Sequence, residues 1–418
     1  MLNMTVRDAA HRVTEEMLLR AMREAAPVLQ RVQAGEEKYA DSQGWMDVDR
    51  WAGDKWLDQI ERIAAQVKAT CDAFVLIGVG GSNNAARSVI EALAEDGVEI
   101  IYAGNTLSPH ALKKMLRSLE GKEYAIDCIA KNFETLEPGS SFRILREAMA
   151  KKYSPEEAAR RTICTGTYGS SLEALCQREG YTFVPFPTDV GGRYSAFSFV
   201  GLLPMAVAGI DIRGLVQGGR DMAKLLHEAD AESNLALRYA ALRNLYHRQD
   251  YALEMLASFE PQFRWFYKWW VQLFAESEGK DGKGIFPVAA EYSEELHAVG
   301  QYLQDGAPLM FETFLDVKAP TESLIIHSDG KADHFDYLNG KDFWDINRAA
   351  FEATVTAHSA KMPCVLLEVE AIDAYHFGQL FYFFQFACAL SGEILGINPF
   401  DQPGVEAYKG WMFKALGK

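Results

Sequence analysis

The first candidate for chemistry is the segment GVGGSNN at residues 78–84, which follows an apolar run and precedes a helix-like one. Its glycines, Gly81 among them, let the backbone approach a ligand closely, and Ser82 adds a hydroxyl near the expected helix N-terminus. A nicotinamide-binding fingerprint would need a third glycine where Asn83 stands. The segment therefore favours a phosphate or a sugar over a dinucleotide, with a tight, serine-capped turn as the structural alternative.

A second candidate is AKNFETLEP, residues 130–138, which also connects an expected strand to an expected helix. Such a turn directs backbone N–H groups at an anion. Lys131, Asn132 and Thr135 could donate hydrogen bonds to the same anion. Glu134 opposes it, because unit charges about 4 Å apart near a protein surface interact by roughly 4 kcal/mol, and a phosphate dianion would feel nearly twice that. A phosphate monoester therefore suits this turn poorly.

Four further charged residues lie in distinctive segments. Arg193 follows two glycines in DVGGRYS, so its guanidinium could reach a ligand and stabilise a developing oxyanion. Glu276 lies in the expected turn AESEGKDGKG (275–284), His297 on an expected helix and Lys409 near the C-terminus. Taken singly, these four are typical of an ion-paired arginine, a solvated charge, a structural histidine and a surface lysine.

The composition narrows the class of protein. The 418 residues, 49% of them hydrophobic, can bury a sizeable core, and the length favours two or three domains. A formal net charge of −16 and a pI near 5.1 argue against the broad basic face that nucleic acid or an anionic membrane requires. The N-terminus lacks the apolar core of a signal peptide, and no apolar run reaches membrane-spanning length. We expect a soluble, cytoplasmic protein with neither partner.

Metal and hydrolase signatures are missing from the sequence. The six cysteines form no CxxC pair, which is typical of small core residues in a reducing compartment. The nine histidines form neither HxxxH nor HExxH, and there is no GxSxG segment. We therefore expect no metal site and no serine hydrolase of the commonest kind.

Short apolar segments alternate with helix-like segments, which is typical of a parallel sheet covered by helices on both faces. Helices are expected from Thr5 to about Gln33, over 54–69, and after Pro403 and Gly404. The expected strands are 73–79, 98–104, 124–130, 162–166, 252–259, 283–292, 309–317, 323–328 and 364–370. The fold class is therefore α/β, with two successive units.

These units suggest four regions along the chain. They are a helical extension over 1–50, a first α/β domain over 51–200, a second over 201–395 and a helical C-terminal tail over 396–418. No long polar linker marks the boundary near residue 200. Because ligands collect at the carboxyl ends of the strands in open parallel sheets, we expect the glycine-rich and charged turns to form the site.

Six motifs in register resemble the phosphoglucose isomerase family: GVGGS, DVGGRYS, GLLPMAVAGIDI, ESEGKDGKG, LHAVGQYLQDG and NPFDQPGVEAYK. The resemblance runs from about residue 70 to the end and is strongest to the shorter bacterial form. It implies two flavodoxin-like sugar isomerase (SIS) domains, a homodimer with shared active sites, and interconversion of glucose 6-phosphate and fructose 6-phosphate without cofactor or metal.

The resemblance also implies roles for individual residues. Glu276 matches the base that moves a proton between C2 and C1 of the open-chain sugar, and Arg193 matches the arginine that steadies the enediolate. His297 and Lys409 match the pair implicated in ring opening, with the histidine entering from the other subunit. These residue types suit the chemistry, since proton abstraction needs a positioned carboxylate and proton exchange near neutrality suits histidine. Ser82 and Gln402 match residues that help to bind the phosphate.

The turn at 130–137 departs from the family pattern S-K-[ST]-[GF]-T-T-x-E, where hydroxyl and backbone N–H groups hold the 6-phosphate. Lys131, Thr135 and Glu137 match, but three hydroxyls are missing and Glu134 replaces a threonine. A singly charged C6 group would suffer about half the repulsion. Sulfoquinovose (6-deoxy-6-sulfoglucose) is therefore the favoured substrate, slightly ahead of glucose 6-phosphate. An unphosphorylated hexose, and a non-catalytic SIS-type sensor of sugar phosphates, remain as alternatives.

Overall fold

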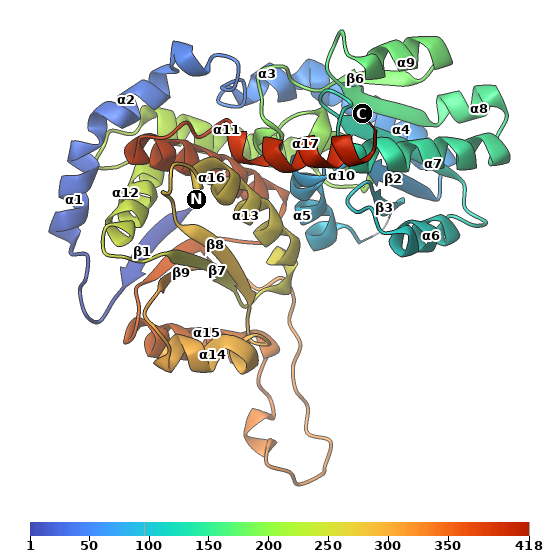
Figure 1. Cartoon of the computed structure of the whole chain (residues 1–418). Coiled ribbons are helices and arrows are strands. Elements are labelled where there is room, and N and C mark those ends of the chain that lie inside the picture. Colours follow the sequence, from blue (N-terminus) through green and yellow to red (C-terminus); the bar gives the residue numbers. More distant parts are fainter. Residues whose placement is uncertain (96, 418) are drawn as a thin grey trace.

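Two mainly parallel sheets form the framework of the protein (Figure 1). The computed structural model describes residues 1–95 and 97–417. The first sheet is parallel throughout, and its strands lie in the order β3-β2-β4-β5-β6. Their bounds are β2 Ala73–Ile77, β3 Glu99–Ala103, β4 Tyr124–Ala130, β5 Thr162–Gly166 and β6 Thr182–Pro185. This is the flavodoxin-like order, so the expected α/β fold is confirmed.

The second sheet has the order β1-β10-β9-β7-β8, with β1 antiparallel to β10 and the other pairs parallel. The bounds are β1 Asn3–Arg7, β7 Leu253–Ser258, β8 Phe286–Glu291, β9 Met310–Val317 and β10 Cys364–Val369. Strand β9 is buried along its whole length, as expected for a parallel strand with helices on both faces.

Helices cover the sheets and fill the space between them (Figure 1). The long helix α16 is apolar on nearly every side, and its buried residues pack against α11, α12 and α13. Even so, no helix in the described part of the chain is long and apolar enough to cross a membrane. The α-helices are α1 Glu15–Glu24, α2 Ala26–Ala34, α3 Val48–Ala52, α4 Asp54–Thr70, α5 Asn84–Leu93, α6 Pro109–Ser118, α7 Leu136–Lys152, α8 Pro155–Arg160, α9 Ser171–Glu179, α10 Phe199–Val207, α11 Ile212–Glu228, α12 Leu235–His247, α13 Arg264–Glu278, α14 Leu296–Asp305, α15 Phe343–Ser359, α16 Ala374–Leu395 and α17 Glu406–Ala415.

The prediction of a helix that begins at Thr5 is wrong for its first residues. Residues Asn3–Arg7 form strand β1, with Met4 opposite Leu367 of β10, and the first helix begins at Glu15. A five-residue segment with apolar positions at Met4 and Val6 fits a strand as well as a helix. Pairing with a distant edge strand decides between them, and that partner is invisible to local periodicity.

The strand expected at 323–328 is also wrong. In the structure Ile325 forms an isolated bridge with Asp342 instead, within the excursion 318–342. Figure 1 shows this excursion projecting from the second sheet, away from the rest of the chain. It exposes the large apolar side chains of Leu324, Phe335 and Tyr337. The short edge strand β6 was not among the predicted strands.

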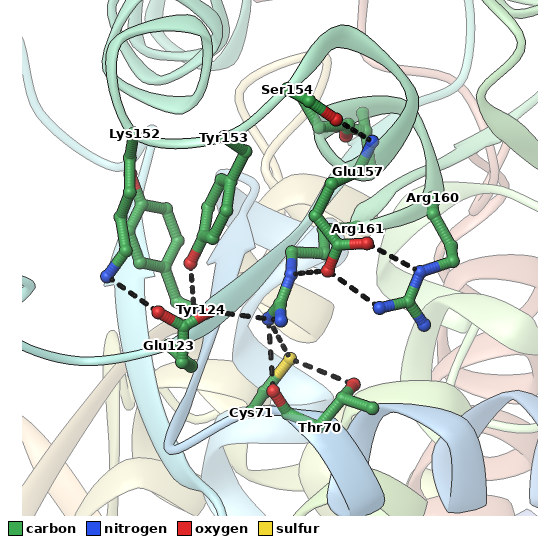
Figure 2. A network of polar contacts seen from close by, with 12 residues as sticks. Thr70, Cys71, Glu123, Tyr124, Lys152, Tyr153, Ser154, Glu157, Arg160 and Arg161 are labelled. Carbon is green, nitrogen blue, oxygen red and sulfur yellow. Dashed lines mark hydrogen bonds and ion pairs between the residues drawn. The ribbon is translucent and has the colours of Figure 1, made fainter.

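A buried arginine joins several elements at the amino end of the first sheet (Figure 2). The Arg161 guanidinium pairs with Glu157 and lies 3.0 Å from an oxygen of Glu123. Its Nη1 donates to the carbonyl oxygen of Thr70, the last residue of α4, and to the Cys71 sulfur, each at 3.1 Å. Arg161 therefore caps α4 and ties it to the segments that enter β4 and β5.

Arg161→Ala is expected to lower the free energy of unfolding by about 2–4 kcal/mol, because buried acceptors lose their charged donor. The matched control is Arg160→Ala, which removes the neighbouring arginine paired with the same Glu157 but 54% exposed in its side chain. That change should cost less than about 0.5 kcal/mol. Urea unfolding of both variants checks the prediction, and equal losses would contradict it.

A buried carboxyl on β4 makes stability depend on pH. Asp127 is fully buried and accepts hydrogen bonds from Thr165 Oγ1 at 3.1 Å, and burial raises its pKa to about 7. A carboxyl with a raised folded-state pKa stabilises the fold fully below its unfolded pKa near 3.8, and this contribution is lost as pH rises to about 7.

Asp127→Asn should therefore gain stability over the parent protein as pH rises from about 4 to 7, by at most about 4 kcal/mol, and then level off. Thr165→Val is the control: it removes the hydroxyl donor, so it should lower stability above pH 7 instead. Thermal unfolding between pH 4 and 8 measures both. A difference between Asp127→Asn and the parent that does not vary with pH would show that Asp127 does not titrate in this range.

Candidate functional site

The candidate site lies where strand order reverses in the first sheet. Strands β2 and β4 are neighbours, with Ile77 opposite Cys128, so the turns at 78–84 and 131–135 leave the same edge side by side. This is the topological switch point of a flavodoxin-like sheet, where ligands bind. The two turns that the sequence singled out are thus brought together.

Gly81 allows one of these turns to touch the arginine segment. A Cβ atom on Gly81 would lie 2.1 Å from the carbonyl carbon of Gly192 and 2.6 Å from the backbone nitrogen of Arg193. No side chain fits in that space, so the short 3-10 turn Gly80–Ser82 packs directly against Gly192–Tyr194. The two glycine motifs therefore meet backbone to backbone and place Arg193 at the site.

Arg193 is 2% exposed, and four of its five N–H groups are engaged. Nε donates to Ser277 Oγ at 2.8 Å. Nη2 donates to the carbonyl oxygens of Pro399 at 2.9 Å and Asp401 at 3.2 Å. Nη1 donates to Gln402 Oε1 at 3.0 Å, which leaves one N–H of Nη1 free.

Glu276 is the carboxylate nearest to Nη1, the nitrogen that carries the free N–H. Glu276 Oε1 lies 3.8 Å from Arg193 Nη1, too far for a hydrogen bond, and Oε2 accepts from Gln272 Nε2 at 3.0 Å. The Glu276 side chain is 26% exposed, so a ligand can reach it. A solvent-accessible carboxylate beside a buried cation suits removal of a proton next to a developing oxyanion.

The expectation that 275–284 forms a solvated turn is wrong for its first half, although residues 281–283 do lie exposed in a turn. Glu276 and Glu278 belong to the last turn of α13, and Glu278 is 1% exposed in an ion pair with Arg243 at 2.7 Å. Lys280 pairs with Asp401 at 2.8 Å, and burial lowers the pKa of Lys280. Lys280 and Arg193 therefore both hold the segment just before the C-terminal helix.

Lys409 and His297 differ in their relation to Glu276. Lys409 on α17 pairs with Glu406 at 2.7 Å, which raises its pKa, and the charge of Glu276 acts in the same direction. His297 is exposed near the start of α14. Within the described residues, no hydrogen bond or ion pair joins His297 to the other three. Charge interactions thus link Glu276 with Arg193 and Lys409 within one chain, and none in the described part of the chain links Glu276 with His297.

The anion turn is held by Lys131 rather than by an internal ion pair. Lys131 Nζ donates to the carbonyl oxygen of Val190 at 3.0 Å, and burial lowers the pKa of this lysine. Glu134 is exposed and has no hydrogen-bond or ion-pair partner in the described part of the chain. Asn132 and Thr135 are exposed as well. The turn therefore presents a carboxylate that nothing in the described part of the protein neutralises.

Several donors around this turn remain available. Thr135 is the N-cap of α7, yet its hydroxyl accepts no helix N–H group. Among the described residues, the Ser82 hydroxyl likewise has no partner. Gln402 gives its Oε1 to Arg193, so its amide nitrogen is left to donate. The geometry permits an anion here, although Glu134 shares the same turn.

The sequence did not indicate the residues that hold the charged groups in place. Gln272 lies one helical turn before Glu276, and that i, i+4 spacing could have identified it. Ser277 and the carbonyl groups of Pro399 and Asp401 carried no signal. No group of three or more residues able to hold a metal ion occurs in residues 1–95 and 97–417.

Together these features define a two-unit parallel α/β protein whose site joins a carboxylate, a buried arginine and a lysine at a switch point. The model of the family described as phosphoglucose isomerase matches residues 55–415. The chain belongs to this family and is an aldose-ketose isomerase of it.

Two curated relatives support this family assignment. A glucose-6-phosphate isomerase from Caldanaerobacter subterraneus subsp. tengcongensis is 40% identical over 389 residues, 90% of this chain and 86% of the relative. One from Staphylococcus saprophyticus subsp. saprophyticus is 40% identical over 388 residues, 91% of this chain and 88% of the relative.

Solved structures share the fold. A hypothetical protein from Thermus thermophilus matches with a TM-score of 0.90 at 26% identity, covering 100% of both chains. A glucose-6-phosphate isomerase from Chlamydia trachomatis matches with a TM-score of 0.83 at 18% identity, covering 99% of this chain and 88% of the other. The second likeness concerns the fold alone.

Proposed function

We propose that the protein isomerises a glucose-type sugar carrying an anionic C6 group to the corresponding ketose. The observation that carries this proposal is the position of Glu276 Oε1, 3.8 Å from Arg193 Nη1, which keeps one N–H group free. Glu276 removes the proton from C2 of the open-chain aldose; the C–H electron pair forms the C1=C2 bond and the C1=O electron pair moves to O1, which gives a cis-enediolate. A proton then passes from O2 to O1, the electron pair left on O2 forms the C2=O bond, and the C1=C2 pair takes the proton back from Glu276 at C1. The ketose is an isomer of the aldose, so no cofactor is consumed.

Arg193 stabilises the enediolate oxygen in this scheme. Its charge is buried and its orientation is set by four hydrogen bonds, so little reorganisation is needed when negative charge develops. Lys409 and His297 open the sugar ring before proton transfer.

We propose a homodimer in which His297 reaches the site of the other subunit. The exposure of His297, and the absence of a hydrogen bond or ion pair between it and Glu276 within the described residues, support this arrangement. The apolar side chains on the excursion 318–342 supply a surface that a second copy could cover. The six free cysteines, all buried, support a cytoplasmic location.

The favoured substrate is sulfoquinovose, whose sulfonate carries one negative charge. Glu134 is unpaired, within the described residues, in the turn that is proposed to hold the C6 group, and the turn lacks three hydroxyls of the family pattern. Glucose 6-phosphate is the second candidate. It is favoured by the exposure of Glu134, which lets solvent and salt weaken the repulsion, and by the names of the relatives.

The test is kcat/KM for sulfoquinovose and for glucose 6-phosphate in one buffer at one ionic strength. We expect sulfoquinovose to be favoured by about a hundredfold, or roughly 2.7 kcal/mol. Glu134→Thr should reduce that preference at least about tenfold. Glu147→Thr, the same change at an exposed position on α7, should leave it unaltered. If glucose 6-phosphate is preferred and Glu134→Thr changes little, the second candidate replaces the first.

A further inference from the structure

A chain of side-chain amides links the GVGGSNN segment to Glu276. Asn83 Nδ2 donates to Asn84 Oδ1 at 3.4 Å, and Asn84 Nδ2 donates to Gln272 Oε1 at 2.9 Å. Gln272 Nε2 then donates to Glu276 Oε2 at 3.0 Å. The chain crosses from the start of α5 to α13, so it connects two elements of the site that are far apart in sequence.

All three amides point the same way. A side-chain amide has a donor end and an acceptor end, and turning it over exchanges them. Because Asn84 occupies Gln272 Oε1 with a donor, the NH₂ group of Gln272 is left facing the carboxylate. If the Gln272 amide were turned over, its oxygen would face the Glu276 carboxylate, and two acceptors that face each other repel.

The glycine turn also restricts Gln272 by shape. Gly80 has φ +56°, a left-handed conformation that favours glycine, and a Cβ atom there would lie 2.9 Å from Gln272 Nε2. The amide therefore packs against a position where any side chain would displace it. The missing Cβ atom of Gly80 leaves room for the Gln272 amide, and the hydrogen bond from Asn84 sets which end of that amide faces Glu276.

We propose that Asn84, acting through Gln272, is a positioning residue that orients the carboxylate of Glu276. This inference rests on the proposed function of Glu276 as the base, but not on which sugar is the substrate. Loss of the correct amide orientation removes the hydrogen bond that Gln272 donates to Oε2, so the carboxylate should leave the position that suits proton transfer.

Other charges act on Glu276 and must stay constant in a test. Arg193 approaches from the segment after β6, at 3.8 Å, and Lys409 approaches from α17. Glu406 pairs with Lys409 and partly offsets it. Changes at Asn84 leave these three groups in place.

The experiment uses Asn84→Asp, nearly the same shape but with an acceptor where the donor was, and Asn84→Leu, which removes the donor without adding charge. We expect Asn84→Asp to lower kcat about tenfold with KM changed less than about twofold, and Asn84→Leu to lower kcat less. In protein labelled with ¹³C at the glutamate carboxyls, the Glu276 signal is assigned with Glu276→Gln. Its chemical shift at one pH should change more in Asn84→Asp than in Asn84→Leu.

The outcomes separate the two proposals. An unchanged Glu276 signal in both variants, with unfolding temperatures like the parent's, overturns the role of Asn84 whatever the activity is. A purely structural role predicts that Asn84→Leu lowers stability while the Glu276 signal stays in place. If the signal changes as expected but Glu276→Gln still turns over substrate, the positioning role stands and the assignment of Glu276 as the base fails.

Discussion

Replacing Glu276 by glutamine is expected to lower kcat by about a thousandfold or more while leaving sugar binding within a few fold. Glutamine has the same shape and can still accept from Gln272, but it cannot take a proton from carbon. Turnover is measured in a coupled assay. Binding is measured calorimetrically with the substrate itself, which the variant no longer consumes.

Glu276→Asp is the graded control for this prediction. It keeps a carboxylate but withdraws it by one methylene, so an intermediate loss of kcat is expected. A sensor of sugars would have no turnover to lose in the parent protein. Turnover by Glu276→Gln close to that of the parent would remove Glu276 from the mechanism.

The second large effect is expected for Arg193→Lys, with kcat/KM lowered by about a hundredfold or more. Lysine keeps the positive charge, but its single ammonium cannot reach Ser277, Gln402 and two backbone carbonyls together and still face the ligand. The orientation of the charge, rather than its presence, is therefore lost.

Lys280→Met tests whether Arg193 acts on the ligand or only holds the C-terminal segment in place. Lys280 also holds that segment, through Asp401 and the carbonyl oxygen of Asn398, but among the described residues its ammonium has no contact with Glu276. We expect it to lower kcat/KM less than about tenfold, although limited proteolysis should cut near residue 400 faster. Equal losses in the two variants would mean that Arg193 acts only by holding the tail.

The sequence by itself determined most of the strands and the residue types of the site. Eight of the nine strands expected from short apolar runs are present, and β4 and β5 match to the residue. Buried parallel strands leave this signal because both faces must be apolar. The glycine motifs also directed attention to Gly81 and Arg193, and in the structure the backbone of Gly192 and Arg193 leaves no room for a Cβ atom at Gly81.

Only the tertiary structure decided what depends on partners distant in the chain. Strand β1 exists because β10 offers an open edge, and Glu278 is buried because Arg243 faces it. Lys131 bonds to Val190 instead of Glu134. Asn84 could not have been linked to Glu276 from their positions in the sequence. The physical reason is that local patterns record burial and backbone conformation, whereas a hydrogen bond between side chains depends on two segments that only the folded chain brings within about 3 Å.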